Sequence, residues 1–220
     1  MQRKLILTND GSHSLFVEQM GETFHSRHGA LQEAVHVYIE NGLKRIQKEE
    51  LRVLEFGFGT GLNALLTAKY AFENHIKIHY ESIEAYPLTS EEYSCLNYAD
   101  KVASSDSFLK LHELPWNQKE AFKFNDYFTI TKHLSKIEDF DSQEKFDLIY
   151  FDIFGYDYQP ELWDYEILKK AFDFLNPGGL WVTYACKGKV NRSLKDIGFQ
   201  IQKLQGPPGK REMTIAYKNH

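Results

Sequence analysis

Residues 53–63 read VLEFGFGTGLN, so that three glycines stand at alternate positions between two apolar stretches. The stretch before the glycines is typical of a buried strand, and the stretch after them is typical of the start of a helix. Glycine adopts backbone conformations that other residues avoid, and it lets a ligand approach the main chain. Such a turn also leaves N–H groups free at the helix N-terminus, at the sheet edge where open α/β folds bind ligands. The pattern therefore predicts a nucleotide-type binding loop.

Strand and helix patterns alternate after this loop. They predict strands near 51–56, 77–84, 127–132, 146–152 and 179–185, and helices near 61–73, 88–98, 160–175 and 189–197. This alternation is typical of a parallel sheet with helices on both faces. The chain then changes pattern, because two apolar-rich runs at 199–204 and 213–217 flank a Gly/Pro loop at 205–209. That arrangement predicts an antiparallel hairpin.

The first fifty residues have their own pattern. Apolar runs at 4–7 and 14–18 flank Asn9-Asp10-Gly11, which predicts a hairpin, and apolar residues from Leu31 to Leu43 recur at helical spacing. We therefore expect a single domain over residues 1–220. It would have an N-terminal hairpin and helix extension over 1–50 and a Rossmann-like core over 51–220, with an insertion around 99–126.

Composition excludes several classes of protein. The 220 residues are 42% hydrophobic and include only two cysteines, Cys95 and Cys186. This is typical of a globular protein without a disulfide framework. No apolar run approaches the ~18 residues of a membrane span, and the N-terminus lacks the pattern of a signal peptide. We expect a cytoplasmic protein that does not associate with membranes.

Charge is distributed unevenly along the chain. The net charge is −5, yet residues 186–218 carry eight Lys and Arg against Asp196 and Glu212, which makes that segment +6 and leaves −11 for the rest. Such asymmetry is typical either of an edge that faces a polyanion or of an ordinary solvated basic surface.

The residues around the glycines bear on which nucleotide is bound. The register from Gly59 to Ala64 also fits the dinucleotide fingerprint G-x-G-x-x-A, so the glycines alone do not decide. Glu55 resembles the acidic residue that opens the E-x-G-x-G-x-G motif of class I S-adenosylmethionine-dependent methyltransferases. Glu84 ends the second strand 23 residues after Gly61, where a carboxylate can accept ribose hydroxyls. The terminal hairpin is similar to the reversed seventh strand of these methyltransferases, and a dinucleotide dehydrogenase does not require it.

A second group of candidate residues follows the fourth strand. Residues 146–152 read FDLIYFD, so Asp152 is expected at the carboxyl edge of the sheet beside the glycine loop. It could instead cap the helix near Glu161, although about eight residues separate the two and caps normally stand directly at a helix start. We predict that Asp152 lies beside a methyl donor, with Phe154 or Tyr156 forming a wall for a flat substrate.

These stretches together resemble one enzyme family. The family is that of the methyltransferase component of the bifunctional enzyme that completes 5-methylaminomethyl-2-thiouridine in tRNA. The stretches that are similar to it are VLEFGFGTGLN, the FDIF turn followed by PELW, PGGLWVTYACKGKVNRSLKDIGF, GKREM and FHSRHGALQEAVHVYIENGL. The similarity runs from about residue 24 to residue 217. A flavin-dependent oxidoreductase domain follows in the bifunctional form, so the chain resembles the stand-alone methyltransferase.

The resemblance implies a cofactor, a substrate and site residues. It implies that S-adenosylmethionine methylates the 5-aminomethyl group of wobble (2-thio)uridine, that the tRNA anticodon loop is the partner, and that a separate oxidoreductase acts upstream. Asp152 is the expected catalytic residue. The expected cofactor-binding residues are Glu55, Gly57, Phe58, Gly59, Gly61, Asn63, Glu84 and Asp152. The expected substrate-binding residues are His28, Glu33, Phe154, Tyr156, Lys210 and Arg211.

The basic residues of the last hairpin and the segment after the third strand carry two further expectations. Lys210 and Arg211 are expected to contact phosphates beside the uridine, with Glu212 pairing with one of them. The family's Gly-Asp after the third strand is absent, because residues 131–135 read TKHLS, so no adenine contact is predicted.

Three alternatives remain open from the residues. His25, His28, Glu33 and His36 could suggest a metal site, but their spacing matches no standard signature, so no metal is expected. A small-molecule amine alkyltransferase, similar to the polyamine synthases, would share the sheet and the acidic loop. A non-catalytic RNA-binding subunit would have no use for an intact donor site.

Overall fold

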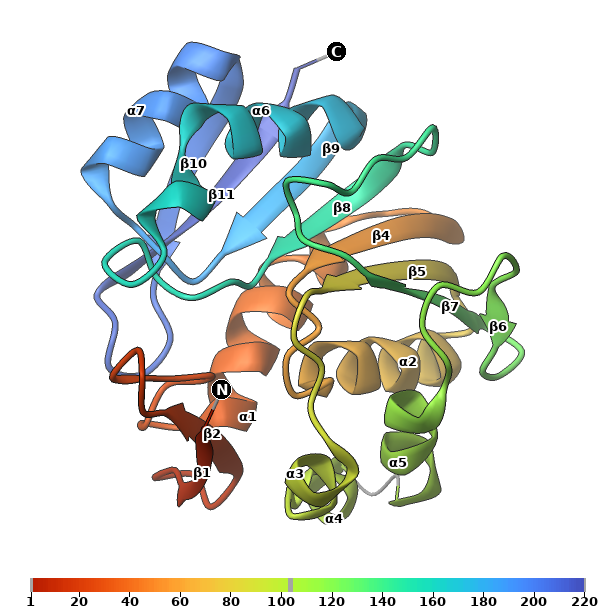
Figure 1. The fold of residues 1–220 in the computed structure, drawn as a ribbon. Helices are drawn as coiled ribbons and strands as arrows, with labels where there is room; N and C mark the ends of the chain where they lie inside the picture. The colour runs from red at the N-terminus through yellow and green to blue at the C-terminus, as the bar shows by residue number, and fades with distance from the viewer. Residues whose placement is uncertain (1, 103–104, 220) are drawn as a thin grey trace.

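The computed structural model describes residues 2–102 and 105–219 and has an α/β fold (Figure 1). The central sheet has the strand order β10-β11-β9-β8-β4-β5-β7-β6. Strands β4, β5, β7, β8 and β9 run parallel, whereas β11 runs antiparallel to β9 and β10. The bounds are β4 (Glu50–Phe56), β5 (Lys77–Glu84), β6 (Phe122–Lys123), β7 (Phe128–Leu134), β8 (Phe146–Phe151), β9 (Leu175–Thr183), β10 (Phe199–Gln205) and β11 (Glu212–Lys218).

The predicted fold class is therefore confirmed, including the antiparallel last strand. The described sheet has one strand more than the seven expected, because the two-residue β6 pairs antiparallel with β7 at the sheet edge. Helices cover both faces. One face carries α2 (Leu62–Asn74) and α5 (Ser105–Glu113), and the other carries α6 (Tyr165–Phe174) and α7 (Gly188–Ile197) (Figure 1). The short 3₁₀ turn η3 (Pro160–Trp163) precedes α6.

Side-chain alternation in the strands explains the two-sided core. Successive residues of a strand point to opposite faces. Val53 accordingly packs in the cluster that includes α2, and its neighbour Leu54 packs in the cluster that includes α6. Both residues are completely buried. The sheet is thus fixed between two apolar layers, and only the ends of its strands are free to carry polar groups.

A smaller sheet, formed by the N-terminal residues, lies beside the main one. It contains β1 (Arg3–Leu7), β2 (His13–Val17) and β3 (Glu22–Thr23), and β1 and β2 pair across a turn that includes Asp10-Gly11. The helical pattern that follows folds as three short pieces: α1 (Ala30–Ala34), the π-type turn η1 (Val35–Glu40) and the 3₁₀ turn η2 (Leu43–Arg45). In η1, His36 Nε2 lies 2.9 Å from the carbonyl oxygen of Gln205, so this segment contacts the β10–β11 hairpin.

The helix predicted over 88–98 is interrupted. The chain instead forms α3 (Ser90–Ser94) and α4 (Tyr98–Val102). Asn97, between them, accepts a hydrogen bond from the His13 N–H (2.8 Å) and donates one to the Gly11 carbonyl (2.9 Å). An asparagine that bonds backbone groups in this way favours a break in a helix. In the predicted insertion, residues 103–104 lie outside the described part. Across residues 2–102 and 105–219, no helix has the length and apolarity needed to cross a membrane.

Candidate active site

Two cavities lie side by side at the carboxyl edge of the sheet. The glycine-loop cavity, about 290 Å³, is lined by Gly57, Gly59 and segments 83–86, 135–138 and 152–154, among others. The hairpin cavity, about 630 Å³, is lined by segments 22–28, 155–158, 184–187 and 210–212, with Glu33. A void of about 20 Å³ is lined by Asp152 and parts of the glycine loop. Phe24 lines all three spaces, so the two cavities are neighbours separated by its ring.

The glycine loop is held tightly to the strand ends around it. A Cβ atom added at Gly57 would lie 2.4 Å from the carbonyl oxygen of Asp152, so only glycine fits between β4 and the residue after β8. Gly59 has φ +51° and donates its N–H to Glu84 Oε2 (2.9 Å). The other oxygen of Glu84 accepts the Tyr86 N–H (2.8 Å). The loop and the Glu84 carboxylate are therefore fixed relative to each other before any ligand arrives.

Two histidines hold Thr60 of the glycine loop from opposite sides. His25 Nε2 lies 2.7 Å from the Thr60 hydroxyl oxygen, and His112 Nε2 lies 3.0 Å from the Thr60 carbonyl oxygen. Burial lowers the pKa of both histidines to about 4. Both rings are therefore neutral near pH 7, and His112 must donate its proton to the carbonyl.

Asp152 lines the glycine-loop cavity and the small void, and segment 155–158 of the hairpin cavity follows it in the chain. Its Oδ2 accepts a hydrogen bond from Asn63 Nδ2 (2.7 Å), at the start of α2. Burial raises the pKa of Asp152 to about 7. The buried Tyr38 hydroxyl lies close to this carboxylate and interacts with it, which opposes the effect of burial on the pKa of Asp152. A carboxyl group that titrates near neutral pH can both accept and release a proton under physiological conditions.

Glu55 and Gly61 line neither cavity. Glu55 is completely buried behind the loop and accepts a hydrogen bond from the Ser82 hydroxyl (2.6 Å), while its other oxygen has no partner among the described residues. Burial raises the pKa of Glu55 to about 8, so near pH 7 it is mostly a neutral acid. A Cβ atom added at Gly61 would approach the rings of Phe58 and His112 within about 3 Å. Both residues support the loop from behind.

The other predicted cofactor residues do face a cavity. Gly57, Gly59, Glu84 and Asp152 line the glycine-loop cavity, and Phe58 and Asn63 line the small void. The predicted substrate residues separate into two places. Phe154 lines the glycine-loop cavity, where its ring meets that of Phe24 edge to face at 5.1 Å. The others line the hairpin cavity: His28, Glu33, Tyr156, Lys210 and Arg211.

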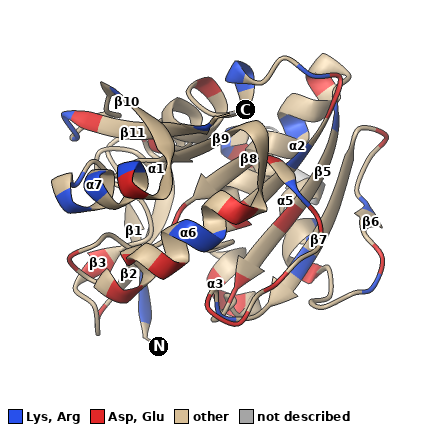
Figure 2. Ribbon diagram, turned by 90° about the horizontal axis from the view of Figure 1, so that it is seen from above, with Lys and Arg blue, Asp and Glu red and all other residues tan. Residues whose placement is uncertain are grey.

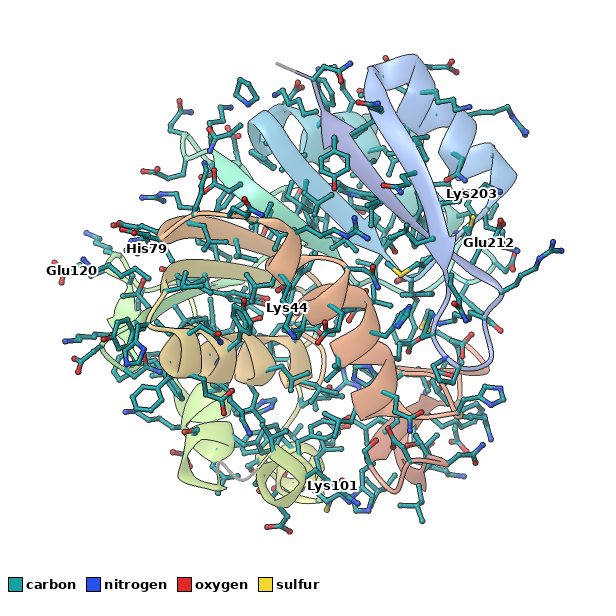
Figure 3. The ribbon with its side chains drawn as sticks, turned by 180° about the vertical axis from the view of Figure 1, so that it is seen from behind. Lys44, His79, Lys101, Glu120, Lys203 and Glu212 are labelled. Atoms are coloured by element: carbon teal, nitrogen blue, oxygen red, sulfur yellow. The ribbon has the colours of Figure 1, made fainter. Side chains whose placement is uncertain are left out.

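The ion pairs of the hairpin differ from those expected. Glu212 was predicted to pair with Lys210 or Arg211, but it pairs with Lys203 at 3.1 Å (Figure 3). Lys210 instead pairs with Glu33 of α1, which is 4% exposed. The prediction placed the partner next to Lys210 in sequence, whereas the fold brings one from 177 positions away. Arg211 is exposed, and basic residues also occur on α7 nearby (Figure 2).

Several lining residues carried no sequence signal. Phe24 and Tyr184 are ordinary aromatic positions in the chain, and segment 135–138 follows a strand that lacks the family's Gly-Asp. The four residues of the possible metal site do not converge: His25 bonds Thr60, Glu33 bonds Lys210 and His36 bonds Gln205. No cluster of three or more His, Cys, Asp or Glu placed to hold a metal occurs in the described ranges.

Comparison with known proteins identifies the family of the chain. A family model described as S-adenosyl-L-methionine-dependent methyltransferase matches residues 105–219. The chain belongs to this family. The methyltransferase is 30% identical, over 226 aligned residues, to the tRNA 5-methylaminomethyl-2-thiouridine biosynthesis bifunctional protein MnmC of Cupriavidus metallidurans, with 96% of this chain and 33% of that protein covered.

Two further relatives extend the comparison. An uncharacterized protein of Methanocaldococcus jannaschii is 27% identical over 98% of this methyltransferase and 59% of its own length. The crystal structure of MNMC2 from Aquifex aeolicus superimposes with a TM-score of 0.77 at 22% identity, covering 98% of this chain and 70% of that chain, which supports the fold. The methyltransferase spans about a third of the length of its MnmC relatives.

The glycine-loop cavity fits the methyl donor of this family. Its lining includes four carboxylates, Glu84, Glu138, Asp152 and Glu161, and two cations, Arg3 and Lys136. An excess of negative charge favours a ligand with a positively charged sulfur. The apolar side chains of Ile83, Ile137 and Leu162 line the same cavity and suit a flat ring.

Proposed function

We propose that this methyltransferase N-methylates the 5-aminomethyl group of (2-thio)uridine at the wobble position of tRNA. The observation that carries the proposal is the position of Asp152 in the wall of a donor-type cavity, three residues before segment 155–158, which lines a second cavity with aromatic walls. The names of the MnmC relatives support the substrate class, because they refer to 5-methylaminomethyl-2-thiouridine biosynthesis in tRNA.

The first cavity would hold S-adenosylmethionine, which supplies a methyl group activated by its positive sulfur. Glu84 would accept the ribose hydroxyls through the lone pairs that Gly59 and Tyr86 leave free. The backbone of Gly57 and Gly59 would lie against the donor, and segment 135–138 would border the adenine. Holding donor and amine in line is worth ~7–11 kcal/mol of the barrier to methyl transfer.

Asp152 would act on the amine. A primary alkyl amine resembles lysine, whose pKa is ~10.4, so near pH 7 it is mostly an ammonium without a free lone pair. A carboxylate beside the nitrogen can orient the amine and accept its proton, directly or through water. The hydrogen bond from Asn63 fixes the orientation of the Asp152 carboxyl group for this task.

The hairpin cavity would hold the splayed uridine. Single-stranded bases in RNA loops bind by stacking on aromatic side chains. Tyr156, Tyr158 and Tyr184 provide such surfaces in the cavity wall. His28 and Arg211, both exposed, would contact the flanking RNA. An upstream oxidoreductase would supply the aminomethyl substrate.

A methyl-transfer assay tests the proposal. The protein is incubated with labelled S-adenosylmethionine and either a free polyamine precursor or bulk tRNA from cells that accumulate the 5-aminomethyl nucleoside, and donor binding is measured alongside. The tRNA is then digested and its nucleosides are separated. Label is expected in the 5-methylaminomethyl nucleoside. Label in a free polyamine precursor but in no tRNA nucleoside would favour the small-molecule amine alkyltransferase instead. Donor binding without transfer to either substrate would favour the RNA-binding subunit.

A further inference from the structure

The ion pair between Glu33 and Lys210 is almost enclosed. The Glu33 side chain is 6% exposed and that of Lys210 is 31% exposed. The second oxygen of Glu33 accepts the Ser26 N–H at 2.7 Å, and Lys210 Nζ lies 3.8 Å from the centre of the Tyr184 ring. Both charges are thus held in place by several contacts inside the cavity wall. A pair that only joined two surface segments would not need this environment.

The pair lies within electrostatic range of the reacting centre. Glu33 raises the pKa of Asp152 and Lys210 lowers it, so the two members act on the carboxyl in opposite directions. They also act in opposite directions on His25. Other titratable groups interact with Asp152 or with the pair from the surrounding elements. Glu55, Tyr38, Tyr80, Tyr98 and Tyr184 interact with Asp152, and His25 interacts with both members of the pair.

We propose that Lys210 sets the charge of the substrate site by cancelling the buried carboxylate of Glu33, so that a single negative charge, that of Asp152, acts on the amine. This inference rests on the proposed function. An amine reacts through its lone pair, and each additional negative charge nearby stabilises the protonated, unreactive form. The pair therefore keeps the cavity attractive to an amine without holding that amine as an ammonium. Lys210 is a positioning residue in this account, whereas Arg211 contacts RNA.

Opposite substitutions should move the pH profile in opposite directions. Lys210→Met leaves Glu33 uncompensated, so the rising limb of kcat/KM against pH should move to higher pH, by about one unit. Glu33→Gln leaves Lys210 uncompensated, so the limb should move to lower pH. The double variant should return close to the wild-type profile, and Lys210→Arg should retain it.

A matched control uses a second lysine–glutamate pair on the same hairpin. Lys203 pairs with Glu212 on the surface, where both side chains are more than 40% exposed (Figure 3). Lys203→Met should leave the pH profile unchanged because solvent screens this pair. Thermal melting of all variants identifies any that fail to fold, and a purely structural pair would change the melting temperature without moving the pH profile.

A carboxyl ¹³C NMR titration of Asp152 without tRNA separates this inference from the proposed function. The Asp152 midpoint should rise in Lys210→Met and fall in Glu33→Gln, whatever the substrate is. Opposite NMR shifts without any methylated tRNA nucleoside would reject the proposed function and retain the charge-setting role. Normal tRNA methylation with unshifted NMR midpoints and unshifted pH profiles would overturn the inference.

Discussion

The two cavities are built in different ways from the chain. The glycine-loop cavity depends on short motifs at the ends of neighbouring strands, such as residues 57–59 after β4, Glu84 at the end of β5 and Asp152 after β8. The hairpin cavity combines residues 22–28 and Glu33 with residues near 155, 185 and 210. The glycine-loop cavity follows from the sheet topology, so any chain with this fold can form such a cavity. The second depends on an N-terminal extension that contacts the last hairpin, and it can therefore vary between substrates.

The largest expected effect concerns the glycine-loop cavity. Gly59→Val adds a branched side chain at a left-handed position and directs it toward the Phe24 ring, 3.2 Å from the added Cβ. We expect loss of measurable S-adenosylmethionine binding by calorimetry. Gly21→Val is the control, because Gly21 also has a positive φ but has no neighbour within 4 Å of an added Cβ. Normal donor affinity in Gly59→Val would show that the donor binds elsewhere.

The next effect tests Asp152, in the wall of the glycine-loop cavity. Asp152→Asn keeps the shape of the side chain but removes its charge and its capacity to accept a proton. Turnover of tRNA should fall by ~10²-fold or more, while the protein remains folded by circular dichroism. Near-normal turnover across the neutral pH range would assign proton acceptance to another group.

A smaller effect is expected from Arg211, which lines only the hairpin cavity. Arg211→Ala should weaken tRNA binding and reduce the slope of log affinity against log salt by about one unit or less, as expected for one lost phosphate contact. S-adenosylmethionine affinity should not change, since Arg211 does not line the glycine-loop cavity. An unchanged salt slope in filter-binding measurements would place the RNA on a different surface.

A last prediction distinguishes support of the loop from contact with the donor. The folded protein holds the Glu55 pKa near 8, above the ordinary 4.5, so the unfolded chain releases this proton first as pH rises. Glu55 therefore lowers stability progressively between about pH 4.5 and pH 8. The unfolding free energy of Glu55→Gln minus that of wild type should therefore be larger at pH 8 than at pH 5. Urea denaturation of both proteins at the two pH values measures it. A constant difference between the two proteins would mean that Glu55 is ionised when folded.

Sequence reasoning predicted the fold and the glycine-loop cavity better than the hairpin cavity. Strand ends in a parallel sheet must meet at one edge, so Glu84 and Asp152 could be placed beside the glycines from their positions alone. The partner of Lys210 could not be found in this way, because Glu33 reaches it only through the packing of α1 against the last hairpin. The neutral state expected for Glu55 also depends on its complete burial, which the motif does not show.

The contacts between η1, α1 and the last hairpin also affect the order in which the chain folds. His36 and Glu33 find their partners 169 and 177 positions further along the chain. Contacts of such long sequence separation form late, because a long loop must close before they contribute any stability. During synthesis on the ribosome, the glycine loop and its strands can therefore organise while the N-terminal segment still lacks its partner. The methyltransferase would become able to hold its substrate only after residues near 210 have been made and have returned to the segment synthesised first.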